Sequence, residues 1–187
     1  RVRLHVAIGR CPYPHARIRR IDARAALEQG AAAAVLLGET VVADTEPITV
    51  LRPLPGTAST VFHAMAYPVA RYEGEPVVAV VAEDRYAAED ALELIEIDYE
   101  PLPHVVAAEA ALDLGAPQLH ATVRGNLLVE STLRTGEPEA KLASGVVVSG
   151  TLRINRVSGA PIETRGVVAR FRRDSNPIEV WSSTQTP

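Results

Sequence analysis

The sequence predicts an α+β protein, in which short helices alternate with strands in the first part of the chain and strands dominate the last part. Two observations carry this prediction. A strand–Asp–helix–strand pattern occurs twice before residue 101, and alternation of apolar and polar residues returns after residue 145. We expect a first domain over residues 1–112, a linker over 113–125, and a truncated, β-rich start of a second domain over 126–187.

The clearest unit reads "VVAVVAEDRYAAEDALELIEIDYEPLP" from Val77 to Pro103. Residues 77–81 are apolar on both faces and predict a buried strand. Asp84 is an N-cap candidate for a helix whose apolar face carries Ala87, Ala88, Ala91, Leu92 and Ile95. Residues 95–100 alternate and predict a half-buried strand. If the two strands are parallel neighbours, the crossover is right-handed.

The same pattern occurs earlier in the chain. Residues 16–21, "ARIRRI", predict a strand, and Asp22 is the candidate cap of a helix over 23–29. Gly30 is a natural helix stop, and residues 31–37 then predict a second strand before Gly38. The repetition indicates an internal pseudo-repeat within the first domain.

The remaining segments are assigned by composition and alternation. The first ten residues predict a strand, residues 40–67 a long loop rich in Pro, Gly and Thr, and residues 107–112 one or two helical turns. Residues 113–126 show no periodicity and are interpreted as a linker. Strands are expected over residues 145–155, 166–173 and 178–183, with the turn "DSNP" at 174–177 between the last two.

Charge and composition limit the function classes. The 187 residues carry a net charge of −4, so no basic field is present to attract nucleic acid. Cys11 is the only cysteine and cannot form an intrachain disulfide, and no apolar run is long enough for a membrane span. We therefore expect a cytoplasmic protein that binds no nucleic acid and has no membrane span.

The residues alone indicate no self-contained active site. The histidines are scattered at positions 5, 15, 63, 104 and 120, so no metal ligand set is expected. The acids between Glu89 and Glu100 follow helix and strand outer faces rather than a cation site, and Cys11 is interpreted as a packed residue. The sequence contains neither a Gly-rich nucleotide loop nor a nucleophile elbow. We assign no catalytic or metal-ligating residue.

Several long motifs, in order, resemble one family. They are "CPYPHARIRRID" at 11–22, the segment at 72–106, "GAPQLH" at 115–120, "APIETRGVVARF" at 160–171 and "VWSSTQTP" at 180–187. Together they are similar to the large subunit of molybdenum hydroxylases, the xanthine dehydrogenase/aldehyde oxidase family, which includes the large chain of carbon monoxide dehydrogenase. The resemblance covers nearly the whole chain.

The resemblance implies a fold and an activity. It implies an a/b hammerhead domain followed by the start of the molybdopterin-binding domain, in a large subunit that hydroxylates a small aldehyde, an N-heterocycle or carbon monoxide. It also implies a molybdenum–molybdopterin cofactor, usually as the cytosine dinucleotide. Electrons would pass to FAD and 2Fe–2S clusters on partner subunits or domains. The one residue role carried over is that of Gln185, whose amide would donate to an oxo ligand of molybdenum.

The chain also departs from the family pattern. Cys11 replaces the usual serine, and Thr164 stands where proline is common. The catalytic glutamate and the substrate-facing loops of the family would lie beyond Pro187, so this chain alone is expected to be inactive. Two alternatives remain open: a stand-alone hammerhead scaffold or assembly module without a redox role, and a naturally split subunit completed by a second polypeptide.

Overall fold

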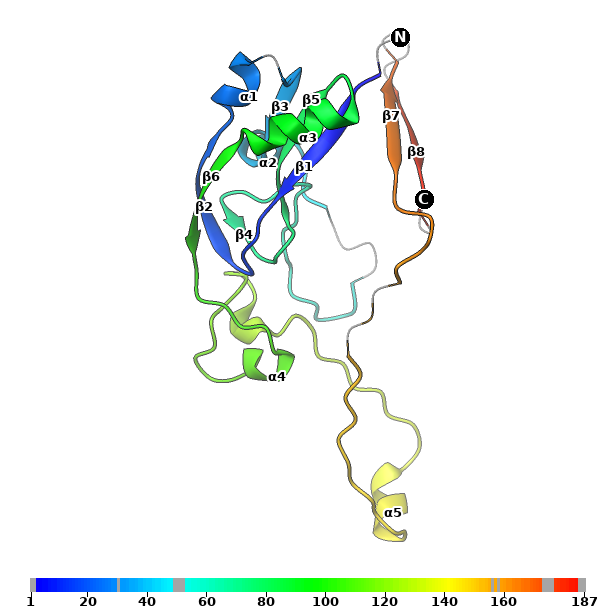
Figure 1. Ribbon diagram of the computed structural model, residues 1–187. Coiled ribbons are helices and arrows are strands. Elements are labelled where there is room, and N and C mark those ends of the chain that lie inside the picture. Colours follow the sequence, from blue (N-terminus) through cyan, green and yellow to red (C-terminus); the bar gives the residue numbers. More distant parts are fainter. Residues whose placement is uncertain are drawn as a thin grey trace. The chain divides into compact units, whose positions relative to one another are not determined.

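The computed structural model of the chain is shown in Figure 1. It describes residues 3–29, 31–48, 53–155, 157, 159–172 and 177–184. The chain forms two compact units, Arg1–Leu133 and Arg134–Pro187, which are described in turn.

The first unit contains two small antiparallel sheets. In one sheet the order is β1 (His5–Arg10), β5 (Pro76–Ala82) and β3 (Ala34–Leu37), so β5 is hydrogen-bonded on both edges. In the other sheet the order is β4 (Val69–Ala70), β2 (Ala16–Asp22) and β6 (Glu96–Pro101). All predicted strands of this region are confirmed.

The pseudo-repeat is confirmed in element order and corrected in topology. The two strand–helix–strand repeats are β2–α1–β3, with α1 at Arg24–Glu28, and β5–α3–β6, with α3 at Arg85–Glu93. Each repeat begins in one sheet and ends in the other, because β5 pairs with β3 and β2 pairs with β6, both antiparallel. β5 and β6 therefore lie in different sheets and form no parallel right-handed crossover. Each repeat instead contributes one strand to a sheet that the other repeat completes.

The two predicted helix caps have different outcomes. Asp84 caps α3 as expected, because its Oδ1 accepts a hydrogen bond from the backbone N–H of Ala87 at 2.9 Å. Asp22 is instead the last residue of β2, and the N-cap position of α1 is Ala23. The carboxylate of Asp22 still accepts from the N–H of Arg24 at 3.1 Å and pairs with its guanidinium. Asp22 therefore lies one residue before the N-cap position and acts as an ion-pair partner of Arg24.

The core is centred on β5, in agreement with the apolar run that predicted a buried strand. Val77, Val78 and Val80 are completely buried. Helix α3 packs across β1 and β5 and contributes the buried Ala88 and Ala91 (Figure 1). Small alanines on the helix face let the helix approach the sheet closely, so a helix of only nine residues covers one face of β5.

The long loop expected from residue 40 begins later. Helix α2 covers Gly38–Asp44, and it packs against β3 and β5. A Cβ on Gly38 would lie 2.4 Å from the carbonyl oxygen of Ala66, so only glycine allows this junction of strand and helix. The β-branched residues of α2 are weak helix formers, and packing overrides that propensity.

Beyond β6 the first unit has only short helical turns. Helix α4 at Ala108–Ala111 confirms the turns expected over 107–112, and a 3₁₀ turn follows at Arg124–Asn126. Residues 113–126, expected to be a linker, form a compact segment, and the domain limits themselves stay a prediction. Within the described residues, no helix has the length and apolar character required to cross a membrane.

The second unit contains helix α5 (Pro138–Ala143) and a hairpin of β7 (Val167–Phe171) and β8 (Ile178–Ser182). Both hairpin strands are confirmed, whereas residues 174–176 of the expected turn lie outside the described residues. The strand predicted over 145–155 is wrong: these residues form no strand, and Val146, Leu152 and Ile154 are exposed. Alternation predicts a strand only where a neighbouring strand is available to pair.

The burial of β5 yields a stability prediction. Val80→Ala should lower the free energy of unfolding by about 2 kcal/mol, because two buried methyl groups are lost and a cavity remains. Val6→Ala on β1, where the side chain is 59% exposed, is the matched control and should change it by less than about 0.5 kcal/mol. Urea unfolding of the 187-residue chain measures both, and equal effects would contradict the assignment of β5 as the core strand.

Candidate functional site

Gln185, the one residue with a sequence-predicted cofactor role, lies outside the described residues. The segment that leads to it is described and belongs to the hairpin of the second unit. Arg170 on β7 pairs with Glu179 on β8 through its Nε at 2.8 Å, and its guanidinium lies 5.5 Å from the ring centroid of Trp181. Arg172 also reaches Glu179, at 3.3 Å. These cross-strand contacts fix the register of the two strands.

The hairpin brings together the two C-terminal motifs that the sequence analysis singled out. Ser183 donates its backbone N–H to the carbonyl oxygen of Gly166 at 3.1 Å, and its hydroxyl donates to the carbonyl oxygen of Thr164 at 3.2 Å. The described residues of the two motifs, 160–171 and 180–184, are therefore side by side in the hairpin. The chain immediately before Gln185 carries the uncharged hydroxyls of Ser182, Ser183 and Thr184.

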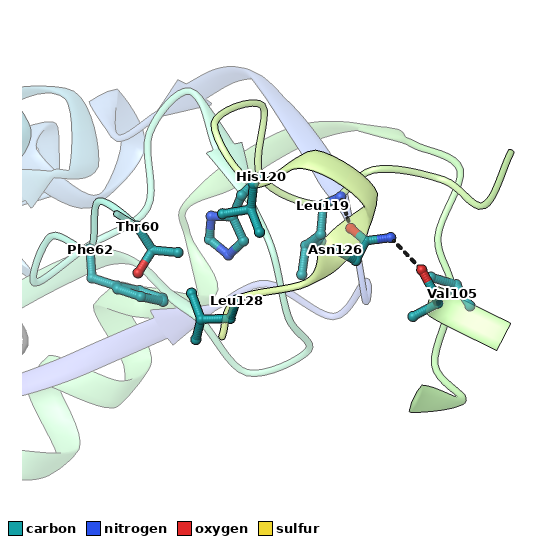
Figure 2. A pocket seen from close by; sticks show the side chains of 9 residues that line it. Thr60, Phe62, Val105, Leu119, His120, Asn126 and Leu128 are labelled. Carbon is teal, nitrogen blue, oxygen red and sulfur yellow. Dashed lines mark hydrogen bonds between the residues drawn. The ribbon is translucent and has the colours of Figure 1, made fainter. Parts of the chain in front are cut away.

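The first unit contains a pocket that sequence reasoning did not find. Its volume is about 260 Å³, and its walls come from three segments, at residues 60–62, 105–111 and 119–128. The side chains of Phe62, His120 and Leu128 converge in it (Figure 2). The lining is predominantly apolar, so this pocket suits an apolar group better than a polar one.

Asn126 holds the walls of this pocket in place. Its Oδ1 accepts from the N–H of Leu119 at 2.9 Å, a bond drawn in Figure 2. Its Nδ2 donates to the carbonyl oxygens of Ala111 and Pro117, each at 3.0 Å. Asn126 has a positive φ of 57°, following Gly125 at 64°. The dipeptide Gly–Asn was the available sequence signal, since both residues favour such turns.

His120 is the titratable group of the pocket. Its ring makes an edge-to-face contact with Phe62, with 5.6 Å between the ring centroids. Burial lowers the pKa of His120 below its usual value near 6.5, and the nearby charges of Arg71 and His15 lower it further. The imidazole is therefore neutral at physiological pH and forms part of an apolar wall.

His15 is a structural residue of the first unit. His15 is buried, and its Nδ1 lies 2.8 Å from the carbonyl oxygen of Pro103, the acceptor for a ring N–H. Across the described ranges, no three His, Cys, Asp or Glu side chains gather in a way that could hold a metal ion. The predicted cytoplasmic location is not tested by the structure and stays a prediction.

Cys11 is a packed core residue, as its sequence context suggested. It is 1% exposed, and burial raises the pKa of its thiol, so the reactive thiolate is disfavoured. Its sulfur lies 3.5 Å from the N–H of Tyr13, whose ring makes an edge contact with Tyr99. The pKa of Tyr99 is also raised, mainly by burial and further by the neighbouring Cys11. The Tyr99 hydroxyl is buried and has no hydrogen-bond partner among the described residues.

Glu75 is the buried carboxyl group of the first unit. Its Oε2 accepts from the backbone N–H of Arg71 at 2.5 Å, and it is 7% exposed. Burial raises its pKa, and the bond to Arg71 opposes that shift. Glu75 therefore closes the turn that precedes β5 and does not line the pocket.

Comparison with known proteins assigns this architecture. Residues 2–103 match the family model described as "Aldehyde oxidase and xanthine dehydrogenase, a/b hammerhead domain". The chain belongs to this family. Residues 119–187 match the model of the molybdopterin cofactor-binding domain, so the two matched regions follow in the order that the sequence motifs indicated. The α+β fold class and the resemblance to molybdenum hydroxylases are thereby confirmed.

Individual relatives agree with the family assignment. The chain is 32% identical to the nicotine 6-hydroxylase large subunit of Paenarthrobacter nicotinovorans, covering 98% of this chain and 22% of that protein. It is 32% identical to the carbon monoxide dehydrogenase large chain of Afipia carboxidovorans, covering 95% and 23%. The quinoline 2-oxidoreductase structure from Pseudomonas putida 86 matches with a TM-score of 0.89 and 36% identity, over 98% and 23%. The chain thus spans less than a quarter of these relatives.

The neutral state of His120 yields a pH prediction for the first unit. A histidine whose folded pKa is lowered contributes stability that is complete above its unfolded pKa and is lost as the pH falls through the folded pKa. Stability should therefore decline from about pH 7 to about pH 5. His120→Gln should reduce this decline in urea unfolding, whereas the exposed control His104→Gln should not. An unchanged pH slope in His120→Gln would contradict the shift.

Proposed function

We propose that this chain is the N-terminal portion of the large subunit of a molybdenum-cofactor-dependent hydroxylase. The observation that carries the proposal is the ordered pair of family matches, hammerhead over 2–103 and molybdopterin-binding over 119–187, which together occupy almost the whole chain. The relatives named as a large subunit or large chain support a multi-subunit enzyme. We propose domain limits at 1–112 and 126–187, with 113–125 connecting them.

The local chemistry near the end of the chain fits a molybdopterin cofactor. The described residues that follow Trp181 are uncharged hydroxyl side chains on a hairpin with a fixed register, and Gln185 adds an amide two residues after Ser183. Such groups donate hydrogen bonds to cofactor oxygens without introducing a competing charge. We propose that Gln185 contacts the cofactor, which supplies the redox chemistry when bound. In the same proposal the cofactor is the cytosine dinucleotide form.

The proposed partners and substrates follow from the family. FAD and 2Fe–2S clusters would reside on partner subunits or domains, and the remainder of the molybdopterin-binding subunit would supply the catalytic base. The substrate class we propose is a small aldehyde, an N-heterocycle or carbon monoxide. The relatives that support it are named for nicotine, carbon monoxide and quinoline. This chain alone would be inactive because it provides no catalytic base.

The proposal predicts the composition of the native complex. A complex isolated from the source cell with this chain as bait should contain near-stoichiometric molybdenum, together with iron and flavin, in a large assembly. Metal analysis and native mass measure this directly. A metal-free species of the size of this chain would contradict the proposal and favour a scaffold. Molybdenum held on a separate polypeptide would instead identify a split subunit.

Gln185 has a separate test in that complex. Gln185→Ala should lower kcat/KM about 10- to 100-fold with a panel of aldehydes and N-heterocycles, because one hydrogen bond to a ligand of the metal is lost. Gln29→Ala, at an exposed position after α1, is the matched control. Equal activity of the two variants at equal molybdenum content would remove Gln185 from the proposed site.

A further inference from the structure

The pocket of the first unit has no role in the proposed chemistry, yet it is formed by a specific arrangement of side chains. Its volume of about 260 Å³ exceeds the roughly 150 Å³ of an engineered cavity that binds benzene. A leucine or phenylalanine side chain therefore fits. Both N–H donors of the Asn126 amide are used in holding Ala111 and Pro117, so neither is left to donate to a polar ligand.

The pocket lies within an interface between the two matched family regions. Thr60 and Phe62 belong to the hammerhead match, whereas Leu119, His120 and Leu128 belong to the molybdopterin-binding match. The two regions already contact each other here. Ala58 donates its N–H to the carbonyl oxygen of Leu128 at 2.7 Å, and Phe62 packs on His120. A group bound in the pocket would therefore contact residues of both regions and enlarge the interface between them.

Apolar side chains next to the lining residues are exposed. Val106, which follows the lining residue Val105, is 83% exposed, and Leu112, which follows Ala111, is 60% exposed. Leu127, which precedes Leu128, is 46% exposed. Exposed apolar residues of this kind are typical of a surface that another protein segment covers.

We infer that this pocket is the docking site for a large apolar side chain supplied by the rest of the molybdopterin-binding subunit. The inference rests on the proposed function, because relatives of this chain are more than four times its length and that remainder is the occupant. Continuity with the existing interface favours this occupant over a second copy of the chain or a small molecule. The docked side chain would join the hammerhead to the cofactor-binding domain.

Site-specific photo-crosslinking in the purified native complex tests this inference. A benzophenone amino acid replaces Phe62 in the pocket or, as the control, Tyr86, an aromatic residue of α3 that is 77% exposed. Mass spectrometry of the crosslinked peptides identifies the partner. We expect the Phe62 crosslink to reach residues of the same subunit beyond Pro187, with a yield at least about tenfold above that of Tyr86. Molybdenum content is measured on the same samples.

Each outcome decides one claim. Crosslinks from Phe62 only to another subunit, to a second copy, or to no peptide would overturn the docking site. If the wild-type complex lacks molybdenum, the proposed function fails, whatever the crosslink reports. A second variant, Thr60→Trp, fills the pocket without relying on the crosslinker. It should lower the fraction of subunit that retains molybdenum about tenfold relative to Tyr86→Trp, and equal retention would also overturn the inference.

Discussion

The antiparallel pairing of β5 with β1 on one edge and β3 on the other is the interaction on which the first unit depends. It removes both edges of an apolar strand from solvent and leaves Val77, Val78 and Val80 fully buried. Because β3 comes from the first strand–helix–strand unit and β5 from the second, neither unit can complete its sheet alone. In the second sheet, β2 of the first repeat pairs with β6 of the second repeat. Strand exchange therefore makes the two halves of the pseudo-repeat mutually dependent.

Local patterns predicted the elements of this unit but not their pairing. The positions of β2, β5, α3 and β6 follow from side-chain periodicity, which adjacent residues determine. Which strands are neighbours depends on contacts between distant residues, and periodicity carries no information on that. The same limitation explains residues 145–155, whose alternation predicts a strand although no described strand pairs with them. Likewise, Gly38 permits α2 only because the carbonyl of Ala66 lies close by.

For the candidate site, the sequence predicted the family but not the residues that form the pocket. The family emerged from long motifs in order, yet no residue-level argument identified a catalytic group in this chain. The hairpin contacts of Ser183 with Thr164 and Gly166 now show that two of those motifs are adjacent in space. The pocket was missed because its residues lie in aperiodic segments. Only Gly125 and Asn126, with their turn-forming preference, signalled an ordered structure there.

The boundary between family regions and the boundary between packed units fall at different places. The molybdopterin-binding match begins at residue 119, whereas the first compact unit extends to Leu133. Residues 119–133 therefore belong to one region by sequence and to the other by packing. The hydroxyl of Thr122 donates to the carbonyl oxygen of Ser59 at 3.0 Å. The N–H of Ala58 donates to the carbonyl oxygen of Leu128 at 2.7 Å. Cutting the chain before residue 119 would remove both partners and leave these groups to water, so the first residues of the cofactor-binding region add contacts to the hammerhead region.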